Sequence, residues 1–127
     1  MKTIGIRVAP SAVTYAIYDD DGAEIVSVDK IVVPKSLSTP EALKYIRYTV
    51  LDIIREYGVE KAGIRLAEGN AKSVNIERIQ IESVIQEALA SSPVESFYCG
   101  RIASISARLN IPREDFKKYL RIRKIIT

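Results

Sequence analysis

The chain has 127 residues, enough for one domain with a single hydrophobic core that needs neither a disulfide nor a metal. It contains no histidine, which excludes the commonest general base, the Ser–His and Cys–His nucleophile pairs, and most zinc and copper sites. Cys99 is the only cysteine, so an intrachain disulfide is excluded and a cytoplasmic location is expected. No signal-peptide pattern and no apolar stretch of roughly 18 residues is present, so no membrane contact is expected.

The first part of the chain predicts three antiparallel strands with short connections. Residues 3–8 are apolar and rich in β-branched side chains, residues 12–18 alternate in polarity, and a third strand covers residues 23 to about 33. The acidic run 19–21 and Gly22 form the turn between the second and third strands, where an Asp-Gly pair favours a positive φ. The expected arrangement is a meander.

A long helix follows the meander. Thr39 is predicted as its N-cap, Pro40 as its first helical residue and Gly58 as its end. Its apolar side chains recur at helical spacing and predict one buried face. These residues are Leu43, Ile46, Val50, Ile53, Ile54 and Tyr57.

The rest of the chain alternates strands and helices. Residues 61–67 predict a fourth strand, and the helix before it implies a crossover that makes it parallel to an earlier strand. A second helix, capped by Ser73, reaches about Ala90, and a fifth strand covers 94–99. One or two helices are expected after that. No linker interrupts the chain, so residues 1–127 predict one α/β domain.

Two five-residue segments of the chain are nearly identical, GIRVA at 5–9 and GIRLA at 63–67. Each copy lies in an apolar run typical of a buried strand. If the two strands are neighbours, Arg7 and Arg65 emerge together at one edge of the sheet.

The order of elements resembles the ribonuclease H-like fold, and within it the RuvC-like Holliday-junction resolvase branch. Residues 4–7 and 12–19 are similar to that branch's opening, where an Ile-Gly-Ile-Asp run leads into a hairpin. Residues 51–65 look like its first helix running into the fourth strand. The resemblance covers most of residues 3–99. It implies a five-stranded mixed sheet of order 3-2-1-4-5 flanked by helices, with the first and fourth strands adjacent.

Active members of the family carry an aspartate on the first strand and a glutamate on the fourth, which hold the divalent ions that activate water. The matching positions here are Arg7 and Arg65, and their permanently charged guanidinium groups repel Mg²⁺. The acidic turn at 19–21 is expected at the other end of the sheet. Glu68 is better suited to pairing with an arginine. The resemblance therefore implies a degenerate site with no metal, no cofactor and no nuclease activity.

Two interpretations of the arginines stay open. Each guanidinium offers a planar set of donors that suits phosphate, so the pair can form an anion clamp for a nucleic-acid backbone. The alternative pairs them with Glu68 or another carboxylate in an internal network, or places them at a subunit interface.

The basic side chains are concentrated after residue 100. Residues 1–100 carry 11 basic and 14 acidic side chains, whereas residues 101–127 carry 8 basic and 2 acidic ones, which favours an anionic partner there. Segment 103–120 faintly resembles a helix-turn-helix, and in that interpretation five basic residues contact phosphates. They are Lys117, Lys118, Arg121, Arg123 and Lys124. The alternative is that these helices pack on the sheet with their lysines facing outward.

These patterns predict a catalytically inactive binding or regulatory module for nucleic acid or another phosphate-bearing ligand. The alternative is a protein-interaction or structural module, a homo-oligomer with no nucleic-acid role. Cys99 is interpreted as a small core residue, because no histidine is present to activate its thiol.

Overall fold

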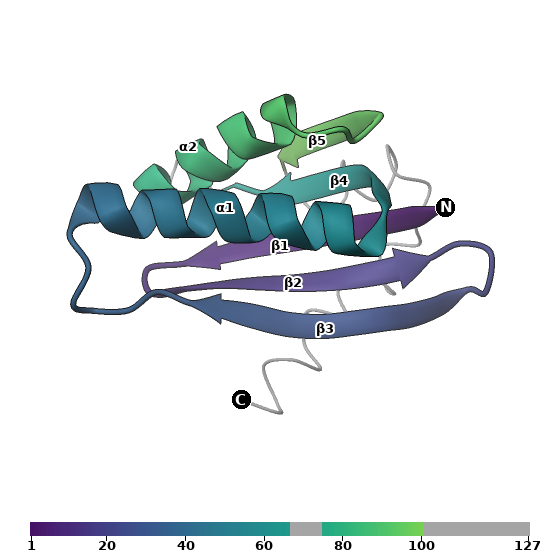
Figure 1. Cartoon of the computed structure of the whole chain (residues 1–127), viewed down its shortest axis with the longest axis horizontal. Helices are drawn as coiled ribbons and strands as arrows, with labels where there is room; N and C mark the ends of the chain where they lie inside the picture. Colours follow the sequence, from purple (N-terminus) through teal and green to yellow (C-terminus); the bar gives the residue numbers. More distant parts are fainter. Residues whose placement is uncertain (67–74, 101–127) are drawn as a thin grey trace.

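A five-stranded sheet with two helices on one face organises the part of the chain that the computed structural model describes, residues 1–66 and 75–100 (Figure 1). The helices predicted after the fifth strand lie outside these residues. The elements in chain order are β1 (Lys2–Ala9), β2 (Ala12–Asp19), β3 (Glu24–Val32), α1 (Thr39–Tyr57), β4 (Val59–Arg65), α2 (Ile76–Ser91) and β5 (Ser96–Gly100). Neither described helix is long and apolar enough to cross a membrane.

The sheet has the order β3-β2-β1-β4-β5, which the resemblance to the ribonuclease H-like fold implies. Strands β1, β2 and β3 form the antiparallel meander, while β4 pairs in parallel with β1 on one side and with β5 on the other. The parallel pairing of β1 and β4 follows from the crossover through α1, which returns the chain to the starting end of the sheet.

The hydrophobic core lies between the sheet and the two helices. In β1, Ile4, Ile6 and Val8 are at most 2% exposed and belong to the same buried cluster as residues of α1 and α2. Because side chains alternate along a strand, the odd-numbered residues of β1, including Arg7, project from the other face of the sheet. The same alternation puts Ile64 in the core and Arg65 on that other face.

Both helix N-caps differ from the prediction. Ser38, not Thr39, caps α1, because its Oγ accepts a hydrogen bond from the Glu41 backbone N–H and also donates to the Glu41 carboxylate. Helix α2 begins later than expected and is capped by the side chain of Asn75, which accepts from the Arg78 N–H, so the prediction of Ser73 as the cap is wrong. Gly58 ends α1 in the left-handed conformation, as predicted.

The turn between β2 and β3 also differs in detail. The positive φ falls on Ala23, at 49°, and not on Gly22. The Ala23 N–H donates to the carbonyl of Asp20, which closes a turn with Asp21 and Gly22 at its central positions, and Ala23 follows them in the left-handed conformation.

Candidate anion-binding site

Two arginines are direct partners across the parallel strands at the middle of the sheet. Arg7 of β1 is in register with Arg65 of β4, two positions beyond the pair formed by Gly5 and Gly63. Neighbouring strands are about 4.8 Å apart, so the two side chains leave the same face of the sheet side by side. Both are partly buried. The adjacency of the two strands that the resemblance implies is therefore confirmed.

A third arginine, Arg78, comes from the first turn of α2. Burial lowers the pKa of Arg7, and the charges of Arg65 and Arg78 lower it further. A guanidinium stays protonated at neutral pH even so, which means that three positive charges share this end of the sheet. In Figure 1, α2 begins near the end of the sheet where β1 and β4 terminate.

A buried carboxylate holds Arg78 in place. Glu82, one helical turn further along α2, has a side chain only 6% exposed, and its Oε2 lies 3.4 Å from Arg78 Nε. Arg78 Nε is itself buried and is not aligned for a hydrogen bond. The pair therefore restrains the direction of Arg78 while leaving donors of its guanidinium for other groups.

The sequence did not reveal Arg78 or Glu82 as part of this site. The available signal was their spacing of four residues at the start of the helix that follows β4, a common pattern on helix surfaces. Only the packing of α2 against β1 brings Arg78 near enough for its charge to act on Arg7.

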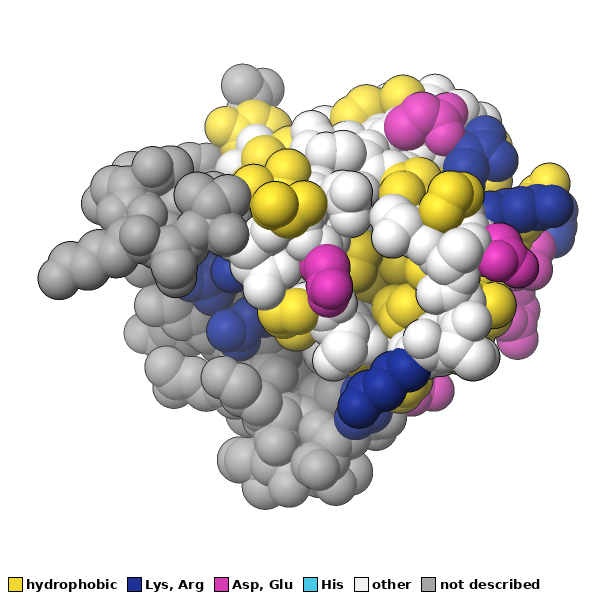
Figure 2. Space-filling model, turned by 90° about the vertical axis from the view of Figure 1, so that its left-hand side faces the viewer, with side chains coloured by type: hydrophobic (Ala, Val, Ile, Leu, Met, Phe, Trp, Pro, Cys, Tyr) yellow, Lys and Arg dark blue, Asp and Glu magenta, His cyan; other side chains and the backbone are white. Residues whose placement is uncertain are grey.

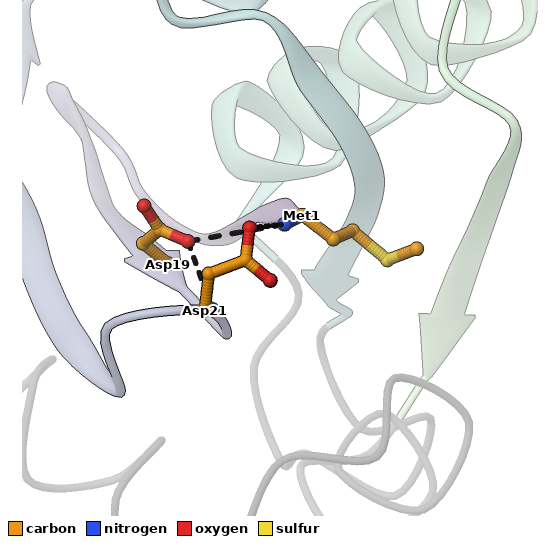
Figure 3. Close-up of polar contacts among 3 residues, drawn as sticks. All are labelled: Met1, Asp19 and Asp21. Carbon is orange, nitrogen blue, oxygen red and sulfur yellow. Dashed lines mark hydrogen bonds and ion pairs between the residues drawn. The ribbon is translucent and has the colours of Figure 1, made fainter.

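The acidic turn at 19–21 lies at the opposite end of β1 from Arg7. Asp19 pairs with Lys2 in the β1–β2 register, five positions before Arg7. Figure 3 shows what the turn contacts instead: the terminal ammonium of Met1 lies 2.9 Å from Asp21 Oδ2 and 3.8 Å from Asp19 Oδ1. These carboxylates therefore cannot take the place of acids at the positions of Arg7 and Arg65.

Several predicted site residues lie outside the described part of the chain. These are Glu68, Lys117, Lys118, Arg121, Arg123 and Lys124. Within residues 1–66 and 75–100, neither Arg7 nor Arg65 forms an ion pair with a carboxylate. In the same residues no three acidic or cysteine side chains gather as metal ligands do.

Cys99 is the remaining candidate with reactive chemistry. Its side chain is partly buried and packs against the core from β5. Burial raises the pKa of its thiol, which disfavours the nucleophilic thiolate.

Comparison with known proteins gives a result only at the level of structure. No protein-family model matches the chain. No curated protein matches it in sequence.

Solved structures of Holliday-junction resolvases are similar in fold. RuvC of Thermus thermophilus in complex with a Holliday junction matches with a TM-score of 0.65 at 12% identity, over 79% of this chain and 64% of that one. The fowlpox virus resolvase with its Holliday-junction substrate matches with a TM-score of 0.51 at 13% identity, over 79% and 60%. The chain thus spans less than two thirds of the length of these resolvases. The likeness shows that this chain has the ribonuclease H-like fold, with RuvC-like resolvases among its structural neighbours.

Proposed function

We propose that this protein is a catalytically inactive ribonuclease H-like module that binds the phosphates of nucleic acid through Arg7, Arg65 and Arg78. The observation that carries the proposal is the register pairing of Arg7 with Arg65 on adjacent strands. By the resemblance to active resolvases, these two positions are where metal-binding acids are expected. An arginine pair there repels divalent cations and attracts the anion that such a site would otherwise receive with its metal.

The balance of charge around the pair supports binding of an external anion. The charges of Arg65 and Arg78 act on Arg7, whereas the acidic partner in the described contacts, Glu82, is already engaged with Arg78. Like charges that are partly buried and uncompensated are unfavourable, so a phosphate between them gains both Coulomb attraction and charge-assisted hydrogen bonds.

Nucleic acid is the favoured source of that phosphate. The structures to which this fold is similar include two resolvases solved with Holliday-junction DNA. The excess of basic residues in 101–127 supports the same choice, and Lys117, Lys118, Arg121, Arg123 and Lys124 remain the predicted additional phosphate contacts.

The direct test is salt-dependent binding to fluorescent four-way junction, single-stranded and duplex DNA, followed by anisotropy. Arg7→Gln and Arg65→Gln should each weaken binding and reduce the slope of log K against log salt by about one. Arg55→Gln is the matched control, because Arg55 is exposed on α1 and pairs with Asp52. Absence of binding to all three DNA forms at low ionic strength would refute the proposal.

Two other outcomes identify different functions. If Arg7→Ala and Arg65→Ala abolish self-association in light scattering while no DNA binds, the arginines serve a protein-interaction or structural module. If the protein cleaves DNA in Mg²⁺ or Mn²⁺ and Glu68→Gln abolishes cleavage, the chain is a nuclease with relocated acids.

A further inference from the structure

A hollow lies at the end of the molecule where α1 and α2 begin, and none of the described residues that line it is an arginine. Its volume is about 350 Å³, within the range of small-molecule sites, which starts at roughly 300 Å³. The β1–β2 turn, the segment joining β3 to α1, and the first turns of both helices line it. Figure 2 faces this end and shows a depression floored by hydrophobic side chains, with charged side chains around it.

The floor of this pocket is aliphatic. Val33 and Leu43 are partly buried against the core, and Ile81 is 5% exposed. Among the described residues that line the pocket none is aromatic, so a branched aliphatic group fits the chemistry of the floor better than an aromatic ring.

The rim carries one cation, one anion and uncharged hydrogen-bonding groups. Lys35 and Glu77 are both exposed, and within the described ranges neither forms an ion pair. Gln80 adds an amide, and Thr39 adds a hydroxyl. The rim therefore offers one group that attracts an anion and one that attracts a cation, and a zwitterion can meet both at once.

The walls are held by backbone hydrogen bonds. The Val33 N–H donates to the Ser11 carbonyl over 3.0 Å, which ties the end of β3 to the β1–β2 turn. The Leu37 N–H donates to the Pro34 carbonyl, and the Ala42 N–H donates to the Ser38 carbonyl at the start of α1. A pocket built this way is present before ligand binds, which reduces the entropic cost of binding.

We infer that this pocket binds a small zwitterion with an aliphatic side chain, the chemistry of an apolar α-amino acid. The ammonium pairs with Glu77, the carboxylate pairs with Lys35, and the aliphatic group rests on Val33, Leu43 and Ile81. Because both ionic contacts lie at the solvent-exposed rim, each is worth little. We therefore expect a dissociation constant on the order of millimolar.

Leucine titration of the full chain, followed by amide ¹H–¹⁵N NMR spectra, tests the inference. Shifts should saturate and be confined to residues around the pocket. Three probes each remove one part of the zwitterion: glycine lacks the side chain, isovalerate lacks the amine, and isoamylamine lacks the carboxylate. Each should bind several-fold more weakly than leucine. The inference would be overturned if the chemical shifts failed to saturate at tens of millimolar leucine. It would also be overturned if isovalerate or isoamylamine bound as tightly as leucine.

Matched variants locate the site. Ala42→Leu should fill the pocket and abolish the leucine shifts, whereas Ala90→Leu makes the same change at an exposed position near the end of α2 and should leave them intact. Glu77→Gln should weaken leucine binding but not isovalerate binding, and Glu56→Gln on α1 is its control. Unchanged leucine binding in Ala42→Leu, with its spectrum showing a folded protein, would place leucine elsewhere and refute the site.

Discussion

Arg7 in β1 and Arg65 in β4 are register partners on two parallel strands, and the positive charge of Arg78 in α2 also acts on Arg7. The pairing of β1 with β4 is what brings the two similar sequence segments together. Since Glu82 is buried against Arg78, the cluster combines a restrained third arginine with two partly buried ones.

Inorganic phosphate should stabilise the folded protein more than sodium chloride at equal ionic strength. A ligand that binds only the folded state raises the free energy of unfolding as its concentration exceeds its dissociation constant. Thermal unfolding should show a higher Tm in phosphate for the wild type and a smaller gain for Arg7→Met. Arg55→Met should keep the full gain, because Arg55 lies on the exposed surface of α1. An identical gain in Arg7→Met and the wild type would contradict the site.

Replacing Ser38 should destabilise the fold, whereas replacing Thr39 should not. Ser38 accepts the hydrogen bond from the Glu41 N–H at the start of α1, and loss of such a cap costs about 1 kcal/mol. Urea unfolding should therefore give a lower free energy of unfolding for Ser38→Ala than for Thr39→Ala. The reverse order would mean that Thr39 caps the helix, as the sequence pattern suggested.

The turn between β2 and β3 should become more stable when glycine and alanine exchange places. Ala23 has a φ of 49°, a left-handed conformation that costs a residue with a Cβ about 1 kcal/mol. Ala23→Gly removes that strain. Gly22→Ala meets only the flexible side chain of Glu24 and restricts the unfolded chain, a gain of about 0.4–1 kcal/mol.

The double variant Gly22→Ala/Ala23→Gly should consequently unfold at higher urea than the wild type, with an unchanged m-value. A large loss of stability in Gly22→Ala alone would show instead that residue 22 requires the left-handed conformation.

Cys99 should react slowly with iodoacetamide at neutral pH. Burial raises the pKa of its thiol, so the midpoint of the rate against pH should lie above that of the urea-unfolded chain.

The raised pKa of the Cys99 thiol also makes the stability of the fold depend on pH. A group with a raised folded-state pKa contributes its stability below the unfolded pKa and loses it as pH rises through the folded value. The stability difference between wild type and Cys99→Ala should therefore shrink above about pH 9. If the alkylation rate had the same pH midpoint in the folded and the unfolded chain, the raised pKa of the Cys99 thiol would be ruled out.

The sequence by itself determined the elements and their order. The apolar spacing from Leu43 to Tyr57 defined the buried face of α1, and the helical crossover made β4 parallel to an earlier strand. These features depend on the periodicity of side chains along each element, which is written directly in the chain. The resemblance to resolvases then gave the sheet order, and with it the pairing of Arg7 and Arg65.

Tertiary structure decided the rest. Which hydroxyl or amide caps a helix depends on the backbone angles at which the chain enters it, so Ser38 and Asn75 are the caps in place of the predicted Thr39 and Ser73. Arg78 joined the site because α2 packs against β1, and the pocket exists because four separated segments meet at one end of the sheet. Such contacts between distant residues have no periodic signature, and only the packed molecule shows them.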